Sequence, residues 1–182
     1  EPPAGRVRNV LIRNVIARGT GSCTLSGHAT SPLENITFDG LLLTLAHDPA
    51  APYERAEHAF AVRHARDFTL RGVELCWSEP AAATWRSALA CEDVAGLRVE
   101  GLVAHPAPVA ATAALSFTNV SDALLTGCRA VAGTGEFLRV AGPRSRDIQL
   151  LGNDLRAARS AWSLASDAMN TVHSSGDLAP KP

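Results

Sequence analysis

The stretch Ser31–Thr44, SPLENITFDGLLLT, holds the pattern from which the fold can be predicted. The apolar residues Ile36 and Phe38 alternate with polar ones, as in a β-strand that buries one face. Asn35 precedes this alternation and Gly40 follows it. Both residue types adopt left-handed backbone conformations at low cost, so they predict that the chain turns at each end of the strand.

Variants of the same phrase return along the chain. Each copy has Asn, Asp or once Gly at its second position, then an alternating strand, then Gly or Asn at a bend. The second positions are residues 9, 35, 67, 96, 122 and 147, and successive copies are 26, 32, 29, 26 and 25 residues apart. Self-similarity at such a period is typical of a solenoid.

A second short strand precedes the repeated one in the later copies. Its apolar positions keep the same offsets, which predicts one internal file formed by Val62, Cys91, Phe117 and Val140. Two or three short strands per copy, with no amphipathic helix between them, predict an all-β fold. We therefore expect a parallel β-helix of about six coils.

The repeat ends after Asn153, and this sets the expected organisation of the chain. We expect coils over 1–160 as the C-terminal part of a larger solenoid, because the repeat is already running at the first residues. The segment 161–182 is expected to form a short cap, either a short helix or irregular, and a flexible tail. The interruptions at 46–58 and 77–87 contain proline and predict loops.

Composition and charge narrow the function classes. The formal net charge is −1 and the only lysine is Lys181, which argues against a nucleic-acid partner. The sequence shows neither a signal peptide nor an apolar run of membrane-spanning length. Four cysteines form no CxxC pair; their even number allows two disulfides, but we favour free, buried thiols. No cofactor is indicated.

Three segments resemble the later coils of the polygalacturonase-like glycoside hydrolases, within the pectin-lyase-like superfamily of right-handed parallel β-helices. They are an early segment, RNVLIRNVIARGTG at 8–21 with SPLENITFDGLLLT at 31–44; FAVRHARDFTLRGVEL at 60–75, with its Arg63-His64 dipeptide; and WRSALACEDVAGLRVEG at 85–101. The resemblance implies a pectic or related polysaccharide as partner and a secreted or periplasmic location.

The catalytic motifs of that family are not found in this sequence. There is no Asn-x-Asp and no Asp-Asp, Gly27-His28 is followed by Ala29, and no arginine stands two residues before Lys181. We therefore expect the end of a hydrolase solenoid that forms part of the glycan groove, works with upstream coils of its parent chain, and is inactive alone. The alternative is a non-catalytic β-helix that binds polysaccharide or a surface.

Candidate site residues are few. Glycoside hydrolysis needs two carboxyl groups, and the one adjacent acidic pair, Glu92-Asp93, is expected to be a solvated turn. No residue is assigned a catalytic role, and the histidines match no metal-ligand spacing. Aromatic rings with polar neighbours can bind sugars, or they can simply fix loops to the wall. The substrate-binding candidates are Trp77, Trp85, Arg86, Arg63, His64 and Tyr53.

Overall fold

A computed structural model describes residues 5–50, 56–108, 113–168 and 171–180. Four long strands run around more than one side of a coil, because left-handed residues turn the chain at a corner without ending the strand. They are β1 (Arg8–Gly19), β3 (Leu33–Leu45), β4 (His58–Trp77) and β5 (Ser87–Glu100). The others are β2 (Cys23–Ser26), β6 (Val103–Ala104), β7 (Leu115–Thr118), β8 (Ser121–Thr126), β9 (Arg129–Ala130), β10 (Glu136–Ala141), β11 (Arg146–Leu151), β12 (Ser160–Leu164) and β13 (Val172–Ser175).

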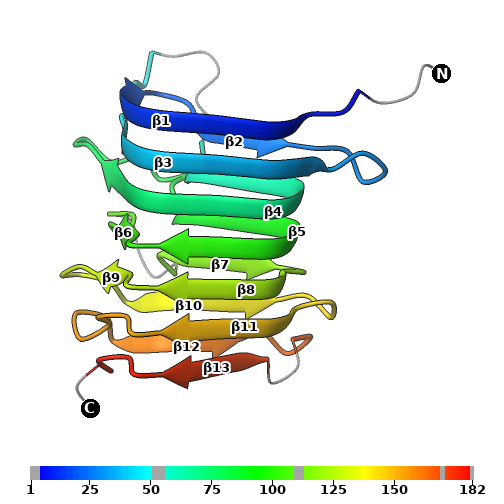
Figure 1. The fold of residues 1–182 in the computed structure, drawn as a ribbon. Helices are drawn as coiled ribbons and strands as arrows, with labels where there is room; N and C mark the ends of the chain where they lie inside the picture. The colour runs from blue at the N-terminus through cyan, green and yellow to red at the C-terminus, as the bar shows by residue number, and fades with distance from the viewer. Residues whose placement is uncertain (1–4, 51–55, 109–112, 169–170, 181–182) are drawn as a thin grey trace.

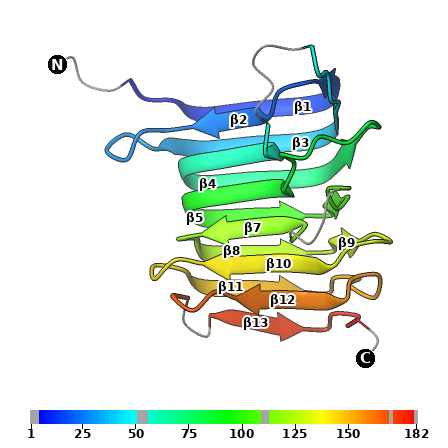
Figure 2. The same ribbon diagram turned by 180° about the vertical axis from the view of Figure 1, so that it is seen from behind.

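These strands stack in parallel along three walls. Wall A contains β2, the first parts of β4 and β5, then β7, β10 and β12. Wall B contains the first parts of β1 and β3, the middle of β4, the second part of β5, then β8, β11 and β13. Wall C contains the last parts of β1, β3 and β4, then β6 and β9. Figure 1 looks onto wall B and Figure 2 onto wall A.

The architecture is a parallel β-solenoid of about six turns, which confirms the predicted fold class. The predicted bends are also confirmed. All six second positions of the repeat have positive φ angles, from 52° to 69°, and so do the Gly or Asn residues at the bends. Because residues other than Gly, Asn and Asp rarely adopt this backbone conformation, these residue types fix where each coil turns.

The core consists of files of apolar side chains, one residue from each coil. In wall A, Val62 pairs with Cys91, Cys91 with Phe117, and Phe117 with Val140. In wall B, Phe68 and Leu97 are neighbours in one such file, and neither is exposed. Neighbouring members of a file are separated by one strand spacing, about 4.8 Å. The internal file predicted from the sequence is therefore correct.

The outer face of wall B carries charges of alternating sign. Arg13 pairs with Asp39 at 3.0 Å, and Arg71 pairs with Glu100 at 2.7 Å, in each case across adjacent coils. Exposed ion pairs of this kind add little stability, with a median of about 0–1 kcal/mol. They offset the charges of Arg13 and Arg71 on this face.

The solenoid extends beyond the boundary predicted at residue 160. Where a short helix or irregular cap was expected, β12 pairs with β10, and Trp162 lies beside Leu138. Where a flexible tail was expected, β13 pairs with β11. The physical reason is that β10 and β11 would otherwise present unpaired backbone groups to solvent, and even a weakly alternating segment satisfies them.

A buried asparagine organises this last coil. Asn153 is 1% exposed, and its amide oxygen accepts the backbone N–H of Cys128 at 2.8 Å. Its amide nitrogen donates to the carbonyl of Leu125 and to the carboxylate of Asp177. A polar group in this position satisfies backbone groups that an apolar file residue would leave unpaired.

The described residues contain no helix. Accordingly, no helix in this part of the chain has the length and apolar character required to cross a membrane.

Candidate functional site

The corner between wall A and wall B begins with a left-handed residue in each of four successive coils. These are His64, Asp93, Asn119 and Gly142, with φ angles of 49°, 53°, 55° and 87°. The backbone conformation is the same in each, but the side chains differ in charge and hydrogen-bonding capacity. A shared conformation at one corner brings these side chains into a row along the solenoid.

A groove of about 410 Å³ runs beside this row. One side of the groove is the row itself, and the other is the first file of wall B. In that file Arg66 pairs with Ala95, Ala95 with Ser121, and Ser121 with Arg146. Ala95 and Ser121 therefore form a floor between the exposed Arg66 and Arg146. These two arginines are three coils apart, which is roughly 14 Å at one strand spacing per coil.

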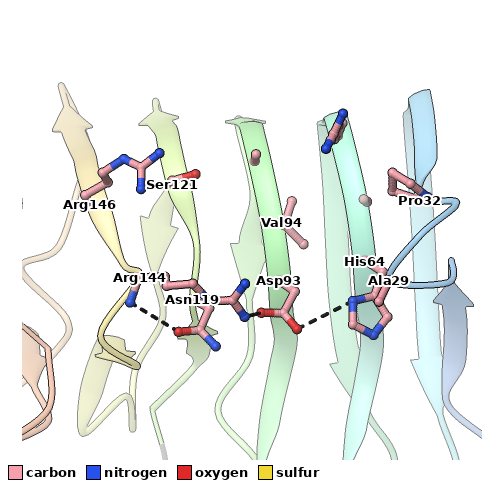
Figure 3. Close-up of a pocket in the computed structure, with 12 residues that line it drawn as sticks. Ala29, Pro32, His64, Asp93, Val94, Asn119, Ser121, Arg144 and Arg146 are labelled. Carbon is pink, nitrogen blue, oxygen red and sulfur yellow. Dashed lines mark hydrogen bonds and ion pairs between the residues drawn. The ribbon is translucent and has the colours of Figure 1, made fainter.

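Arg144 ties the row together across three coils (Figure 3). Its guanidinium donates to the carboxylate of Asp93, and its backbone N–H donates to the side-chain oxygen of Asn119 at 3.3 Å. On its other side, the Asp93 carboxylate lies 3.5 Å from His64 Nδ1. The Asp93 side chain is only 21% exposed, so its charge is largely compensated within the groove.

The charge of the groove is positive. Among its lining residues, Asp93 is the one carboxylate, whereas Arg66, Arg144 and Arg146 are all basic. A second hollow of about 320 Å³ shares Arg144 and Arg146 and continues the groove towards His173 in the last coil. Basic side chains along a depression raise the local concentration of anions.

This arrangement suits binding better than hydrolysis. Cleavage of a glycosidic bond needs an acid and a second carboxylate on opposite sides of the scissile bond. Glu92, the neighbour of Asp93 in sequence, does not line the groove; it lies in a small hollow on wall A and pairs with Arg63 at 3.0 Å. Asp93 is therefore left without a partner carboxylate among the lining residues.

The predicted site residues separate into two places. His64 lines the groove, and Arg63, the preceding residue, faces out from wall A. The indoles of Trp77 and Trp85 stack with ring centroids 4.7 Å apart near the loop that leads from wall C to wall A. Tyr53 lies outside the described residues.

The two tryptophans fix loops. Trp85 is completely buried, so its ring offers no face to a sugar. Its burial fits the alternative role, in which the ring fixes its loop to the wall. Trp77 donates its indole N–H to the carbonyl of His105 at 2.9 Å. Arg86 is exposed, and its backbone N–H donates to the carbonyl of Glu57, so it follows Trp85 in the same fixed loop.

The sequence analysis missed six polar or charged groove residues: Arg66, Asp93, Asn119, Ser121, Arg144 and Arg146. A signal was present, because 64, 93 and 119 each stand three residues before a second position of the repeat, at 67, 96 and 122. Asp93 does stand at a turn, as expected, but its carboxylate is only 21% exposed and lies between the Arg144 guanidinium and His64 Nδ1.

The cysteines are free thiols, as the sequence analysis favoured. Burial raises the pKa of Cys23 and of Cys91, and it raises the pKa of Cys128 to about 11. Burial and the nearby Glu74 carboxylate raise the pKa of Cys76 to about 11. Such thiols are protonated at neutral pH and lack the character of a nucleophilic thiolate.

The fold and the groove together define a parallel β-helix protein with a basic corner groove. No family model, no curated protein and no solved structure matches this chain.

Proposed function

We propose that the groove binds an acidic polysaccharide, of the polyuronate type found in pectin, and that this chain binds the polymer without cleaving it. The observation that carries the proposal is the pair of exposed arginines, Arg66 and Arg146, at either end of a floor of small residues. An extended polymer lying along the solenoid would meet one coil after another, so its carboxylates would face both arginines and Arg144.

The polar row supplies the second recognition element. Asn119 and Ser121 offer hydrogen-bonding groups of the kind that contact sugar hydroxyls, and His64 lies in the same row two coils away. Ion pairing alone would not distinguish a polyuronate from any other polyanion. Hydroxyl recognition along the row provides that distinction, because sulfate or phosphate polymers without sugars would leave these groups unpaired.

The test is binding of oligogalacturonides by isothermal titration calorimetry, in wild type and in Arg66→Ala and Arg146→Ala. We expect each substitution to weaken binding about tenfold, the loss of one charged hydrogen bond. Arg98→Ala is the charge-matched control, because Arg98 lies on wall B but does not line the groove. Equal losses in all three variants, or equal affinity for a neutral oligosaccharide, would refute the proposal.

A second candidate is that this groove is one part of the glycan channel of a polygalacturonase-like hydrolase. What favours it is Pro32, which belongs to the phrase that resembles that family and also lines the groove. In that case upstream coils of the parent chain would supply the catalytic aspartates. Release of reducing ends from polygalacturonate by this chain alone would contradict both candidates, because both assign it binding only.

A further inference from the structure

A cluster on wall C has no role in the groove. Glu74 and Cys76 are alternate residues of β4, so their side chains leave the same face of the wall. His105 follows β6 in the next coil, where the register Glu74↔Val103 and Leu75↔Ala104 places it beside Cys76. Residues 29 to 31 positions apart in the sequence therefore meet at one point.

The ligand atoms of these three side chains lie close together. His105 Nε2 is 3.0 Å from Glu74 Oε1, and Cys76 Sγ is 3.7 Å from the same oxygen. All three atoms fall within 4.8 Å of one another, and this is the one such group of His, Cys, Asp and Glu found among the described residues.

We propose that Glu74, Cys76 and His105 form a binding site for Zn²⁺. Zinc takes sulfur at about 2.3 Å and nitrogen or carboxylate oxygen at about 2.0–2.2 Å, in a tetrahedral arrangement. Tetrahedral angles at those bond lengths put the ligand atoms about 3.3–3.7 Å from one another. The distances of 3.0 and 3.7 Å lie within a few tenths of an ångström of that range.

The mixture of ligands selects the metal. A thiolate and an imidazole favour zinc over calcium or magnesium, which prefer an all-oxygen shell. The side chains of His105 and Glu74 are 39% and 47% exposed, so an ion can enter from solvent. Three protein ligands leave the fourth position to water, and the Cys76 thiol releases its proton to solvent when the metal binds.

The backbone of the histidine is already fixed. The N–H of His105 donates to the carbonyl of Leu75 at 3.0 Å, and its own carbonyl accepts the indole N–H of Trp77 at 2.9 Å. Trp77 is in turn stacked against Trp85. The site therefore rests on two adjacent coils and an aromatic pair anchored by the completely buried Trp85, which lowers the cost of ordering the ligands.

A simple surface ion pair between His105 and Glu74 accounts for only part of this arrangement. An exposed His–Glu pair contributes little to stability and would need no thiol beside it. Here the thiol hydrogen bonds to the same carboxylate oxygen that contacts the imidazole. A metal centre requires several donor atoms around one point, and here a thiol, an imidazole and a carboxylate bring theirs within 4.8 Å of one another; an isolated ion pair has no need of the third group.

The test uses the full chain and two metals, Zn²⁺ by isothermal titration calorimetry and Co²⁺ by absorption spectroscopy. We expect one ion per chain, and for Co²⁺ the thiolate charge-transfer band and the d–d bands of tetrahedral coordination. Cys76→Ser and His105→Gln should each weaken binding by about tenfold or more and remove the tetrahedral cobalt spectrum. Cys23→Ser is the matched control, since Cys23 is a partly buried thiol of β2 on wall A.

The midpoint temperature of unfolding gives an independent measurement. At a hundredfold excess over the wild-type dissociation constant, Zn²⁺ should raise the midpoint of wild type by roughly 5–10 °C and that of Cys76→Ser by no more than about half as much. Equal binding by wild type and Cys76→Ser, or loss of binding in Cys23→Ser, would overturn the proposal. So would absence of saturable Zn²⁺ binding in a wild-type protein that is folded by circular dichroism.

Discussion

Replacing Phe117 with alanine tests the stacked core most directly. The ring is completely buried on β7, where Phe117 pairs with Cys91 of the coil before and Val140 of the coil after. Substitutions of this kind cost about 3–5 kcal/mol. We expect a value near the upper end, because the hydrogen-bonded ladders on both sides hold the coils about 4.8 Å apart and prevent the cavity from closing.

Urea unfolding monitored by circular dichroism measures this cost. With an m-value of about 2 kcal/mol/M, the midpoint should fall by roughly 1.5–2.5 M. The control is Leu11→Ala on β1, where the leucine is 58% exposed and the change should stay within about 0.5 kcal/mol. A Phe117→Ala cost below about 1 kcal/mol, or equal shifts in the two variants, would show that Phe117 does not occupy an internal file.

Three further predictions concern turns, the last coil and pH. Gly96→Ala and Gly72→Ala both force alanine into a left-handed conformation, at about 1–2 kcal/mol; Gly96→Ala should lower the urea midpoint further. The reason is that its methyl group meets a carboxylate oxygen at 2.7 Å, whereas the methyl group at Gly72 meets nothing within 4 Å, so equal midpoints would contradict this geometry. Asn153→Ala should cost about 1–3 kcal/mol, because it leaves the Cys128 N–H unpaired, and unchanged hydrogen exchange at that N–H would refute the assignment. Burial lowers the pKa of His58 below its usual 6.5. The stability that depends on a neutral His58 is therefore complete above pH 6.5 and is lost as the pH falls from 6.5 through the lowered pKa of the folded state. His58→Gln should flatten the pH dependence of the unfolding midpoint in this range, and an unchanged slope would contradict the effect.

The coil pattern is predictable from sequence because turns and core files obey local rules. A left-handed position accepts few residue types, so Asn35, Asp67 and Gly96 reveal the corner without any knowledge of the neighbouring coils. Alternation then assigns the inward side chains, such as Phe68 and Leu97. Each of these signals lies within one short segment, and repetition at about 25–32 residues supplies the rest.

The last coil was misjudged because its signal is tertiary. The segment around Trp162 has only a weak alternation, and nothing in its own sequence requires a strand. The strand forms because β10 offers an unpaired edge and Leu138 offers a partner for the indole ring. Propensity within one segment cannot report what a neighbouring coil leaves unsatisfied.

The candidate site was harder to predict for a related reason. Arg144 belongs to the groove because its guanidinium reaches Asp93, which lies 51 residues earlier in the sequence. The extra residues after Gly142 displace Arg144 from the repeat, so no periodic pattern indicates where its side chain goes. A dipeptide that resembles a family indicates His64, whereas nothing in the sequence distinguishes its partner Asp93 from an ordinary turn residue.

Both candidate sites depend on the same property of the solenoid. Where the backbone needs a left-handed residue, as at the corner of walls A and B, its conformation is fixed but its side chain can vary among His, Asp, Asn and Gly. At outward positions of a strand, as at Glu74 and Cys76, the backbone restricts the residue type even less. Register then brings these variable positions side by side across adjacent coils, so groups that are remote in sequence meet without any loop having to fold over them. A site of this kind should tolerate single substitutions without loss of the fold, which is why binding measurements on Arg66→Ala or Cys76→Ser can be interpreted as losses of contact.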